Sequence, residues 1–246
     1  MRKRVKPLAW AITGAGHFLE EVLTAMREAR KRAQVTAFIS GAAEEVVRIY
    51  GLWEKLQEIC DGSRYSEVFT DRGEGASAVH AGRLARGVYS VLVVAPATAN
   101  TVAKVSVGIA DTLVTNVVAQ ALKGGVPVLI LPTDQSETAL TTLPVRVDSS
   151  LCIGCSPCPA EQACGAGAFT LREGKGAIDY LSCVGCGICI EACPHGAVRR
   201  GERIKVRARR VDLENVEKLR EMPGITVLSD PEELRSVLRS HLGGEP

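Results

Sequence analysis

Eight of the nine cysteines in this chain of 246 residues are concentrated in two short runs. Their spacings are Cys152-x2-Cys155-x2-Cys158-x5-Cys164 and Cys183-x2-Cys186-x2-Cys189-x3-Cys193, with Pro194 directly after the second run. Three thiolates spaced by two residues can surround one face of an iron–sulfur cubane from a tight loop, and Gly154, Gly185 and Gly187 let the backbone approach the sulfides. The fourth ligand then has to come from another part of the chain.

The second run has the form of a bacterial ferredoxin motif, in which the fourth cysteine binds the other [4Fe–4S] cluster. The two runs also form an internal repeat, because the last cysteine of each is followed, after two further residues, by Gly-Ala and an apolar side chain. We therefore assign Cys152, Cys155, Cys158 and Cys193 to one cluster, and Cys183, Cys186, Cys189 and Cys164 to the other. The alternatives are zinc knuckles or disulfides, but zinc favours two separated C-x2-C pairs, often with histidine.

Composition narrows the class of protein further. The length fits one large domain plus a small one. A net charge of +2 and an aromatic content of 4% give no basis for nucleic-acid binding. Asn100, Lys104 and Asp111 interrupt the most apolar region, so no membrane span is expected. Eight cysteines in cluster motifs predict a reducing, cytoplasmic setting.

The remainder of the chain alternates between strands and helices. Predicted strands end at or near polar loops, and predicted helices follow them; the strands are Leu8–Thr13, Gln34–Ile39, Tyr89–Ala95, Val126–Leu131 and Gly224–Leu228. This alternation predicts an α/β fold with a doubly wound parallel sheet. The last strand and helix lie beyond the cysteines, so the cysteine block is expected to be inserted into the larger domain.

Three loops of this predicted sheet carry candidate ligand contacts. Gly14-Ala15-Gly16 follows the first strand, but Leu19 stands where a dinucleotide fingerprint needs its third glycine. The loop after the predicted strand Tyr89–Ala95 is rich in small and hydroxyl residues, namely Pro96, Ala97, Thr98, Ala99, Asn100 and Thr101. These suit a flat or anionic ligand, and equally an ordinary helix cap. Asp134 follows the next strand, at the edge where ligands collect in such sheets.

The segment Pro96–Thr101 resembles the PASANT motif of the homo-oligomeric flavin-containing cysteine decarboxylase-like flavoproteins, over roughly residues 8–144. The resemblance implies a flavodoxin-like fold that binds FMN between subunits. It places FMN contacts at Gly14, Ala15, Gly16, His17 and Ser40, and at Pro96, Ala97, Thr98, Ala99, Asn100 and Thr101. Decarboxylases of the family carry a histidine upstream of the motif; His80 lies about two residues too far away, which argues against decarboxylation.

With the inserted cysteines, the resemblance narrows to archaeal iron–sulfur flavoproteins of the dihydromethanopterin reductase (acceptor) type. It implies that residues 1–145 form an FMN-binding domain and residues 146–206 a ferredoxin-like domain with two [4Fe–4S] clusters. Residues 207–246 would then form a βα unit that belongs to the FMN-binding domain. The implied reaction passes electrons through the clusters to FMN and reduces dihydromethanopterin to tetrahydromethanopterin. His17 and Asp134 are the candidates for pterin contact or proton supply.

Two other functions stay open at this stage: an electron-transfer flavoprotein without a small substrate, and a flavin-dependent decarboxylase. The basic segment Arg199–Arg210 is either a patch for an acidic electron-donor protein such as a ferredoxin or a solvated strand face. The resemblance also implies a homo-oligomer built from trimers. The subunit interfaces are expected on the faces of Thr98–Val107 and Asp111–Lys123 that carry small side chains. The alternative is that these faces are buried against the chain's own sheet.

Overall fold

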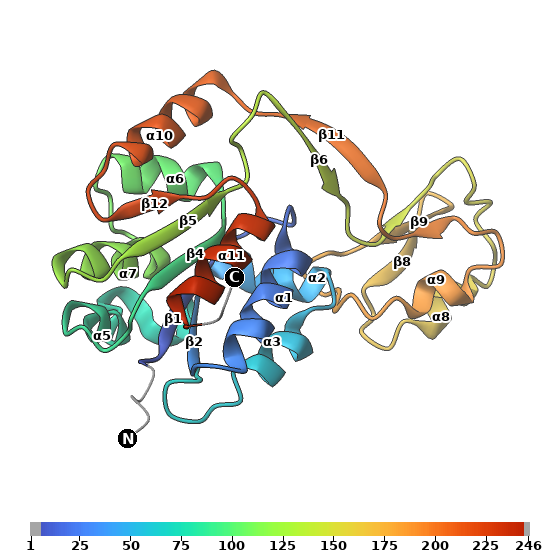
Figure 1. Cartoon of the computed structure of the whole chain (residues 1–246). Coiled ribbons are helices and arrows are strands. Elements are labelled where there is room, and N and C mark those ends of the chain that lie inside the picture. The colour runs from blue at the N-terminus through green and yellow to red at the C-terminus, as the bar shows by residue number, and fades with distance from the viewer. Residues whose placement is uncertain (1–5, 244–246) are drawn as a thin grey trace.

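A computed structural model, which describes residues 6–243, shows a six-stranded sheet whose neighbouring strands are all parallel (Figure 1). The strands are, in spatial order, β12 (Ile225–Val227), β5 (Val128–Pro132), β4 (Leu92–Ala97), β1 (Leu8–Ile12), β2 (Val35–Ile39) and β3 (Val68–Thr70). The order reverses between β1 and β4, which makes the carboxyl ends of these two strands the switch point of a doubly wound sheet.

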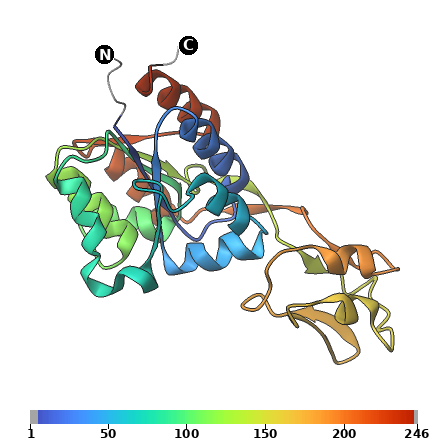
Figure 2. The same ribbon diagram turned by 90° about the horizontal axis from the view of Figure 1, so that it is seen from below.

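Helices cover both faces of the sheet, as Figure 2 shows edge-on. One face carries α1 (Leu19–Arg30), α2 (Gly41–Ile49), α3 (Trp53–Ile59) and α11 (Pro231–His241). The other carries α5 (Gly82–Ala85), α6 (Ala99–Ser106), α7 (Leu113–Lys123) and α10 (Arg210–Arg220). Side chains alternate across β1: Leu8, Trp10 and Ile12 enter the first core, while Ala9 and Ala11 enter the second. Because both faces are covered, the strands read as continuous apolar runs.

The cysteine-rich part stands apart from the sheet, on an antiparallel ribbon of β6 (Thr138–Thr142) and β11 (Arg203–Arg207) (Figures 1 and 2). Beyond the ribbon lie β7 (Arg146–Val147) paired with β10 (Val198–Arg199), the hairpin β8 (Phe169–Arg172) and β9 (Lys175–Ile178), and two short helices, α8 (Pro159–Ala163) and α9 (Ile188–Ala192). The predicted fold class is thus confirmed. The predicted divisions at 145/146 and 206/207 fall near the ends of the ribbon strands and stay predictions.

Two local expectations were wrong. The polar, glycine-rich composition of residues 71–75 predicts a loop, but the segment forms the short helix α4 (Asp71–Glu74), followed by the 3-10 turns η1 (Gly75–Ser77) and η2 (Val79–Ala81). The Thr70 hydroxyl caps α4 by accepting a hydrogen bond from Gly73 N–H. The apolar face of α7 is not an intersubunit surface, because its side chains are buried on the chain's own sheet: Val114, Val117, Val118 and Ala121.

The basic segment near the end of the ribbon has a simple periodicity. In β11, Arg203, Lys205 and Arg207 are exposed, and Ile204 and Val206 between them are half-buried. No helix within residues 6–243 has both the length and the apolar character needed to cross a membrane.

Candidate functional site

The loops that follow β1 and β4 are bonded to each other at the switch point. Thr13, which is 2% exposed, donates a hydrogen bond from Oγ1 to the Pro96 carbonyl at 2.7 Å. The same oxygen accepts a hydrogen bond from Thr98 N–H at 2.8 Å. Thr133, after β5, extends the chain of contacts by donating from its backbone N–H to Ala97 O at 2.9 Å. Three strand ends therefore hold one another at the edge where α/β folds bind ligands.

Two of the predicted FMN contacts also cap helices. The Ser40 hydroxyl accepts from Ala43 N–H at the start of α2, and the Thr98 hydroxyl accepts from Thr101 N–H at the start of α6. Gly14 packs tightly, because a Cβ there would lie 2.6 Å from that of Ala42. The helix-cap interpretation thus holds for both hydroxyl residues. It leaves the first backbone N–H groups of α6, which no helix can satisfy internally, available to an anionic group.

The remaining residues of the PASANT-like segment lie in different environments. Pro96 and Ala97 belong to β4 and are buried, so only their backbone is near the sheet edge. Thr101 is buried and its hydroxyl accepts a hydrogen bond from that of Thr98 at 3.2 Å. Asn100 is exposed, and no hydrogen bond of its side chain occurs within residues 6–243. Its amide is free to meet a ligand or a neighbouring subunit.

Asp71 is a residue that the sequence analysis missed. One carboxylate oxygen accepts from Gly41 N–H at 2.7 Å and the other from Leu113 N–H at 2.6 Å. A single side chain after β3 thereby caps both α2 and α7, helices on opposite faces of the sheet. Its position at the end of a strand, before a glycine-rich stretch, was the only sequence signal for this role.

His17 lies half-buried at the start of α1, with its ring 3.7 Å from that of Phe18. Burial lowers the pKa of His17, while Glu21 and Asp134 oppose that effect through their charges. The ring is therefore neutral at neutral pH. Asp134 is held by a 2.7 Å hydrogen bond from the Thr133 hydroxyl. The structure thus places both predicted catalytic residues at the carboxyl edge of the sheet, close enough to interact electrostatically.

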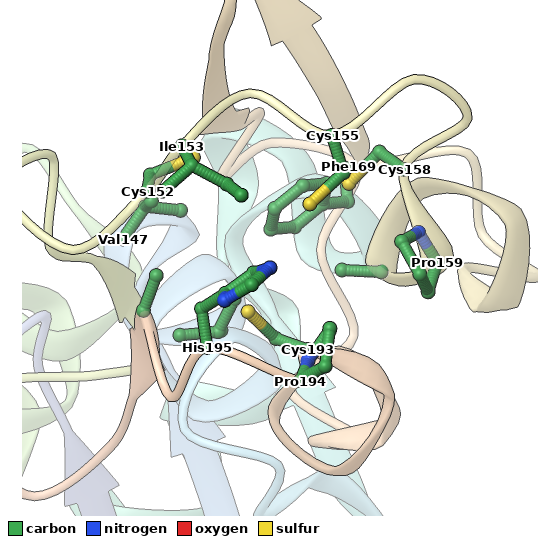
Figure 3. A pocket seen from close by; sticks show the side chains of 13 residues that line it. Val147, Cys152, Ile153, Cys155, Cys158, Pro159, Phe169, Cys193, Pro194 and His195 are labelled. Carbon is green, nitrogen blue, oxygen red and sulfur yellow. The ribbon is translucent and has the colours of Figure 1, made fainter.

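The first cysteine cavity is shown in Figure 3. The sulfur atoms of three cysteines from the first run and one from the second stand around it, with Phe169 and His195 in its wall; they are Cys152, Cys155, Cys158 and Cys193. Gly176 N–H donates to Cys152 Sγ at 3.3 Å and holds the pKa of that thiol below its usual value. This environment favours a thiolate ligand.

The second cysteine cavity repeats the arrangement with the runs exchanged. Its lining includes Cys183, Cys186, Cys189 and Cys164. Four sulfurs spread around a cavity suit a multi-iron cluster, whose ligands lie farther apart than the ligands of one zinc ion. The residues therefore fit cubane clusters better than zinc knuckles.

The second-run loop contacts the α/β part directly at the end of α2. Gly51 and Gly185 both have positive φ, +69° and +66°, and a Cβ on Gly51 would lie 2.6 Å from Gly185 O. Arg200 donates a hydrogen bond to the same Gly185 carbonyl. Since α2 begins after its N-cap Ser40 and ends beside this loop, one nine-residue helix connects the carboxyl edge of the sheet with the second cysteine cavity.

The two residues without an assigned role have structural partners. His80 stacks on Phe69 with ring centroids 4.0 Å apart and shares a 2.6 Å hydrogen bond with Glu74. Cys60 is buried, its thiol donates to Val35 O at 3.2 Å, and burial raises its pKa to about 12. These contacts explain both residues as part of the local packing.

Comparison with known proteins identifies the class. Residues 1–146 match the Flavoprotein family and residues 177–199 match the 4Fe-4S binding domain, which spans the second cysteine run. The chain therefore belongs to the Flavoprotein family.

Two curated relatives narrow the class. The chain is 43% identical over 229 residues to dihydromethanopterin reductase (acceptor) of Methanosarcina mazei, covering 92% of this chain and 95% of the relative. It is 42% identical over 231 residues to the protein of the same name from Methanocaldococcus jannaschii, covering 92% and 93%. The resemblance drawn from the motifs is confirmed, and the chain is an iron–sulfur flavoprotein oxidoreductase similar to these reductases.

Solved structures agree with the fold. Burkholderia xenovorans DmrB in complex with FMN, described as a cubic protein cage for redox transfer, superimposes with a TM-score of 0.62 at 27% identity, covering 99% of this chain and 98% of that one. The cypemycin decarboxylase CypD, at 14% identity and a TM-score of 0.52, shares the fold alone.

Proposed function

We propose that this protein reduces dihydromethanopterin to tetrahydromethanopterin, using FMN and two [4Fe–4S] clusters. The observation that carries the proposal is the pair of cysteine cavities, each built from three cysteines of one run and the last of the other. One of them lies against the end of α2, a helix that starts at the flavin-side edge of the sheet. The names of the two curated relatives supply the substrate.

The residues present fit an FMN phosphate at the switch point. Backbone N–H groups at the starts of α2 and α6 lie at this edge, together with the capping hydroxyls of Ser40 and Thr98; Thr101 is buried behind Thr98. Gly14, Ala15, Gly16 and His17 bring a second loop to the same edge. When bound, the clusters supply single electrons and FMN supplies the two-electron chemistry that reduction of a C=N bond requires.

The chain's own contribution is to position the substrate and hold a proton near it. His17 is neutral at neutral pH, so one ring nitrogen carries a proton and the other is an acceptor. Asp134 accepts a hydrogen bond from the Thr133 hydroxyl and favours the protonated form of His17 through its charge. We assign pterin contact or proton supply to His17, which lines the cavity beside this edge, and proton supply to Asp134, which does not line it.

The expected surroundings of the enzyme complete the proposal. A cytoplasmic location suits the eight cluster cysteines. The exposed cations Lys205 and Arg207 of β11 provide a surface for an acidic electron-donor protein such as a ferredoxin. The cubic protein cage described for DmrB supports a homo-oligomer. Its construction from trimers, with FMN between subunits, is what the motif resemblance implies.

Two alternatives make different predictions. A pure electron-transfer flavoprotein has no use for a ligand-sized cavity, yet a cavity of ≈ 450 Å³ lies beside His17. A flavin-dependent decarboxylase has no use for the cysteine cavities, and His80 is engaged with Glu74 and Phe69. Both features favour the reductase.

The test is a single-turnover experiment under anaerobic conditions. The purified holoprotein is reduced, freed of reductant and mixed with 7,8-dihydromethanopterin while the flavin absorbance is followed. We expect the flavin to be reoxidised and the tetrahydro product to form in proportion. Reduced protein mixed with buffer alone is the control. A flavin that stays reduced in both mixtures would leave the electron-transfer alternative as the better account.

A further inference from the structure

A cavity of ≈ 450 Å³ separates the flavin-side loop from the β6/β11 ribbon. Its walls include Gly16, His17 and Glu21 from the β1–α1 region, Tyr50 from the end of α2, and Arg200 and Arg203 from the arm that leaves the cysteine-rich part. Small-molecule sites have volumes of roughly 300–1,000 Å³. The cavity is therefore large enough for a fused two-ring ligand, and it shares two residues with the loop to which we assign FMN.

The cavity is shaped by specific contacts. The Tyr50 hydroxyl donates to Thr142 O at 2.6 Å and so joins α2 to the ribbon across the cavity. The Tyr50 ring lies so close to Gly16 that any side chain at that position would collide with it. Phe18 adopts φ 65°, a left-handed conformation that is rare for a bulky residue and that concentrates at functional sites.

Charges of both signs line the cavity without neutralising each other. Neither the Glu21 carboxylate nor the Arg203 guanidinium has an ion-pair or hydrogen-bond partner among residues 6–243. Glu20 also contributes no ion pair in this part of the chain, and Arg200 is engaged with Gly185 O. Unpaired acidic and basic groups around one cavity suit a ligand that carries hydrogen-bond donors at one end and a negative charge at the other.

We propose that this cavity binds a pterin that carries an acidic side chain, a proposal that rests on the function proposed above and assigns its substrate site. The amino and ring N–H groups of a pterin lie side by side, so one carboxylate can accept a hydrogen bond from each of them. Glu21 supplies that carboxylate. Arg203 binds the acidic side chain. His17, whose neutral ring lies tilted against that of Phe18, forms the wall toward the flavin-side loop.

Binding measurements on the anaerobic holoprotein test this assignment without requiring turnover. The probes are 7,8-dihydromethanopterin and 7,8-dihydropterin, which lacks the acidic side chain. The variants are Glu21→Gln and Arg203→Gln, and the controls are Glu45→Gln and Arg86→Gln, exposed residues away from the cavity. We expect Glu21→Gln to weaken binding of both probes about tenfold or more, as for a lost charge-assisted contact. Arg203→Gln should weaken only dihydromethanopterin.

The outcomes separate this inference from the function on which it rests. If the parent protein binds dihydromethanopterin and both variants bind it equally well, the site is elsewhere and the function stands. If the parent binds neither probe, the proposed function itself fails. FMN content is measured in every sample: loss of FMN from Glu21→Gln or Arg203→Gln, but not from the controls, would assign the cavity to the flavin and overturn the inference.

Discussion

At the scale of single residues, this protein places buried polar groups where loops must be held together. Thr13 is the clearest case, since one hydroxyl serves as donor to the loop after β4 and as acceptor from the same loop. The half-buried Asp71 carboxylate instead accepts from the first N–H groups of two helices. A buried polar group left without its partner lowers the stability by more than the hydrogen bond itself contributes. Substitutions at these positions are therefore sensitive tests of the candidate site.

Replacing Thr13 with valine keeps its volume and removes both side-chain hydrogen bonds. We expect the free energy of unfolding to fall by about 1–3 kcal/mol, because Thr98 N–H is left unpaired. FMN content should fall as well, since the loop that begins at Thr98 loosens. Denaturant titration and flavin absorbance measure the two effects. Thr24→Val, which alters an exposed hydroxyl bonded within α1, is the control and should change neither.

Cys60 is predicted to be chemically inert in the folded protein. Its pKa is raised from the usual value to about 12, so almost no thiolate is present at pH 8. Iodoacetamide at pH 8 should leave the Cys60 peptide unmodified by mass spectrometry, and the same treatment in denaturant should modify it. As the folded-state pKa is the higher one, Cys60 favours the fold below pH 9 and loses that contribution as the pH rises toward 12. Rapid alkylation of the native protein would contradict the burial of this side chain.

At the scale of elements, the two cysteine runs and the ribbon define how the two parts are joined. The pairing of runs was predicted from a short repeat, and the cavities have the composition that this pairing requires. The contact between Gly51 and Gly185 had no such signal, because each glycine alone reads as a turn. The pairing of the runs and the Gly51–Gly185 contact can each be tested by substitution.

Iron analysis tests the crossed pairing of the cysteine runs. The parent should hold about eight irons per chain, and Cys164→Ser about four. Adding Cys183→Ser to Cys164→Ser should remove no further iron, because both residues line the same cavity. Adding Cys152→Ser instead should remove the rest. The opposite pattern would assign each run its own fourth cysteine.

The substitution Gly185→Ala tests the contact between the second-run loop and α2. Its Cβ would collide with Gly51 N and with the carbonyls of Ile49 and Arg48, all within 2.7 Å. We expect faster hydrogen exchange at residues 48–51, because the loop can no longer rest against them. Gly62→Ala is the matched control: Gly62 has φ +82° and no atom within 4 Å of the added Cβ. Equal exchange in the two variants would show that the contact does not hold the parts together.

The parallel sheet was predictable because each of its longer strands is an apolar run followed by a turn or a helix start. Prediction was weakest where tertiary contacts override local pattern. The segment 71–75 is polar and contains two glycines, yet the Asp71 contacts order it as α4. The apolar face of α7 fitted an intersubunit surface or the chain's own core equally well, and periodicity cannot tell which partner buries a face. The cavity beside His17 was beyond prediction, since its walls come from segments about 180 positions apart in the chain.

At the scale of the whole molecule, apolar side chains that the fold leaves exposed are candidates for contacts between copies. Val107 is 62% exposed and Ile109 is 47% exposed, directly after α6. They lie close along the chain to Asn100, whose side chain has no partner in the described part of the chain. This arrangement is compatible with FMN bound between subunits.

We expect the holoprotein to be a closed homo-oligomer built from trimers, and Val107→Asp to dissociate it with loss of FMN, because a charge at the centre of an apolar interface is costly. Light scattering coupled to flavin absorbance measures both. Leu181→Asp, at a still more exposed apolar position on the cysteine-rich part, should leave the assembly intact. A monomer that retains its FMN would contradict both the assembly and a flavin site shared between subunits.

The position of β12 has a consequence for how the protein is made. This strand pairs with β5 in the sheet, yet it follows β5 in the chain only after both cysteine runs. During synthesis, five strands leave the ribosome before the sixth, and the edge of β5 stays open until the cysteine-rich part has been translated. The sheet can therefore be completed only after the whole insertion has been synthesised. A chain that stops within the insertion keeps an unpaired β edge, a feature that promotes aggregation.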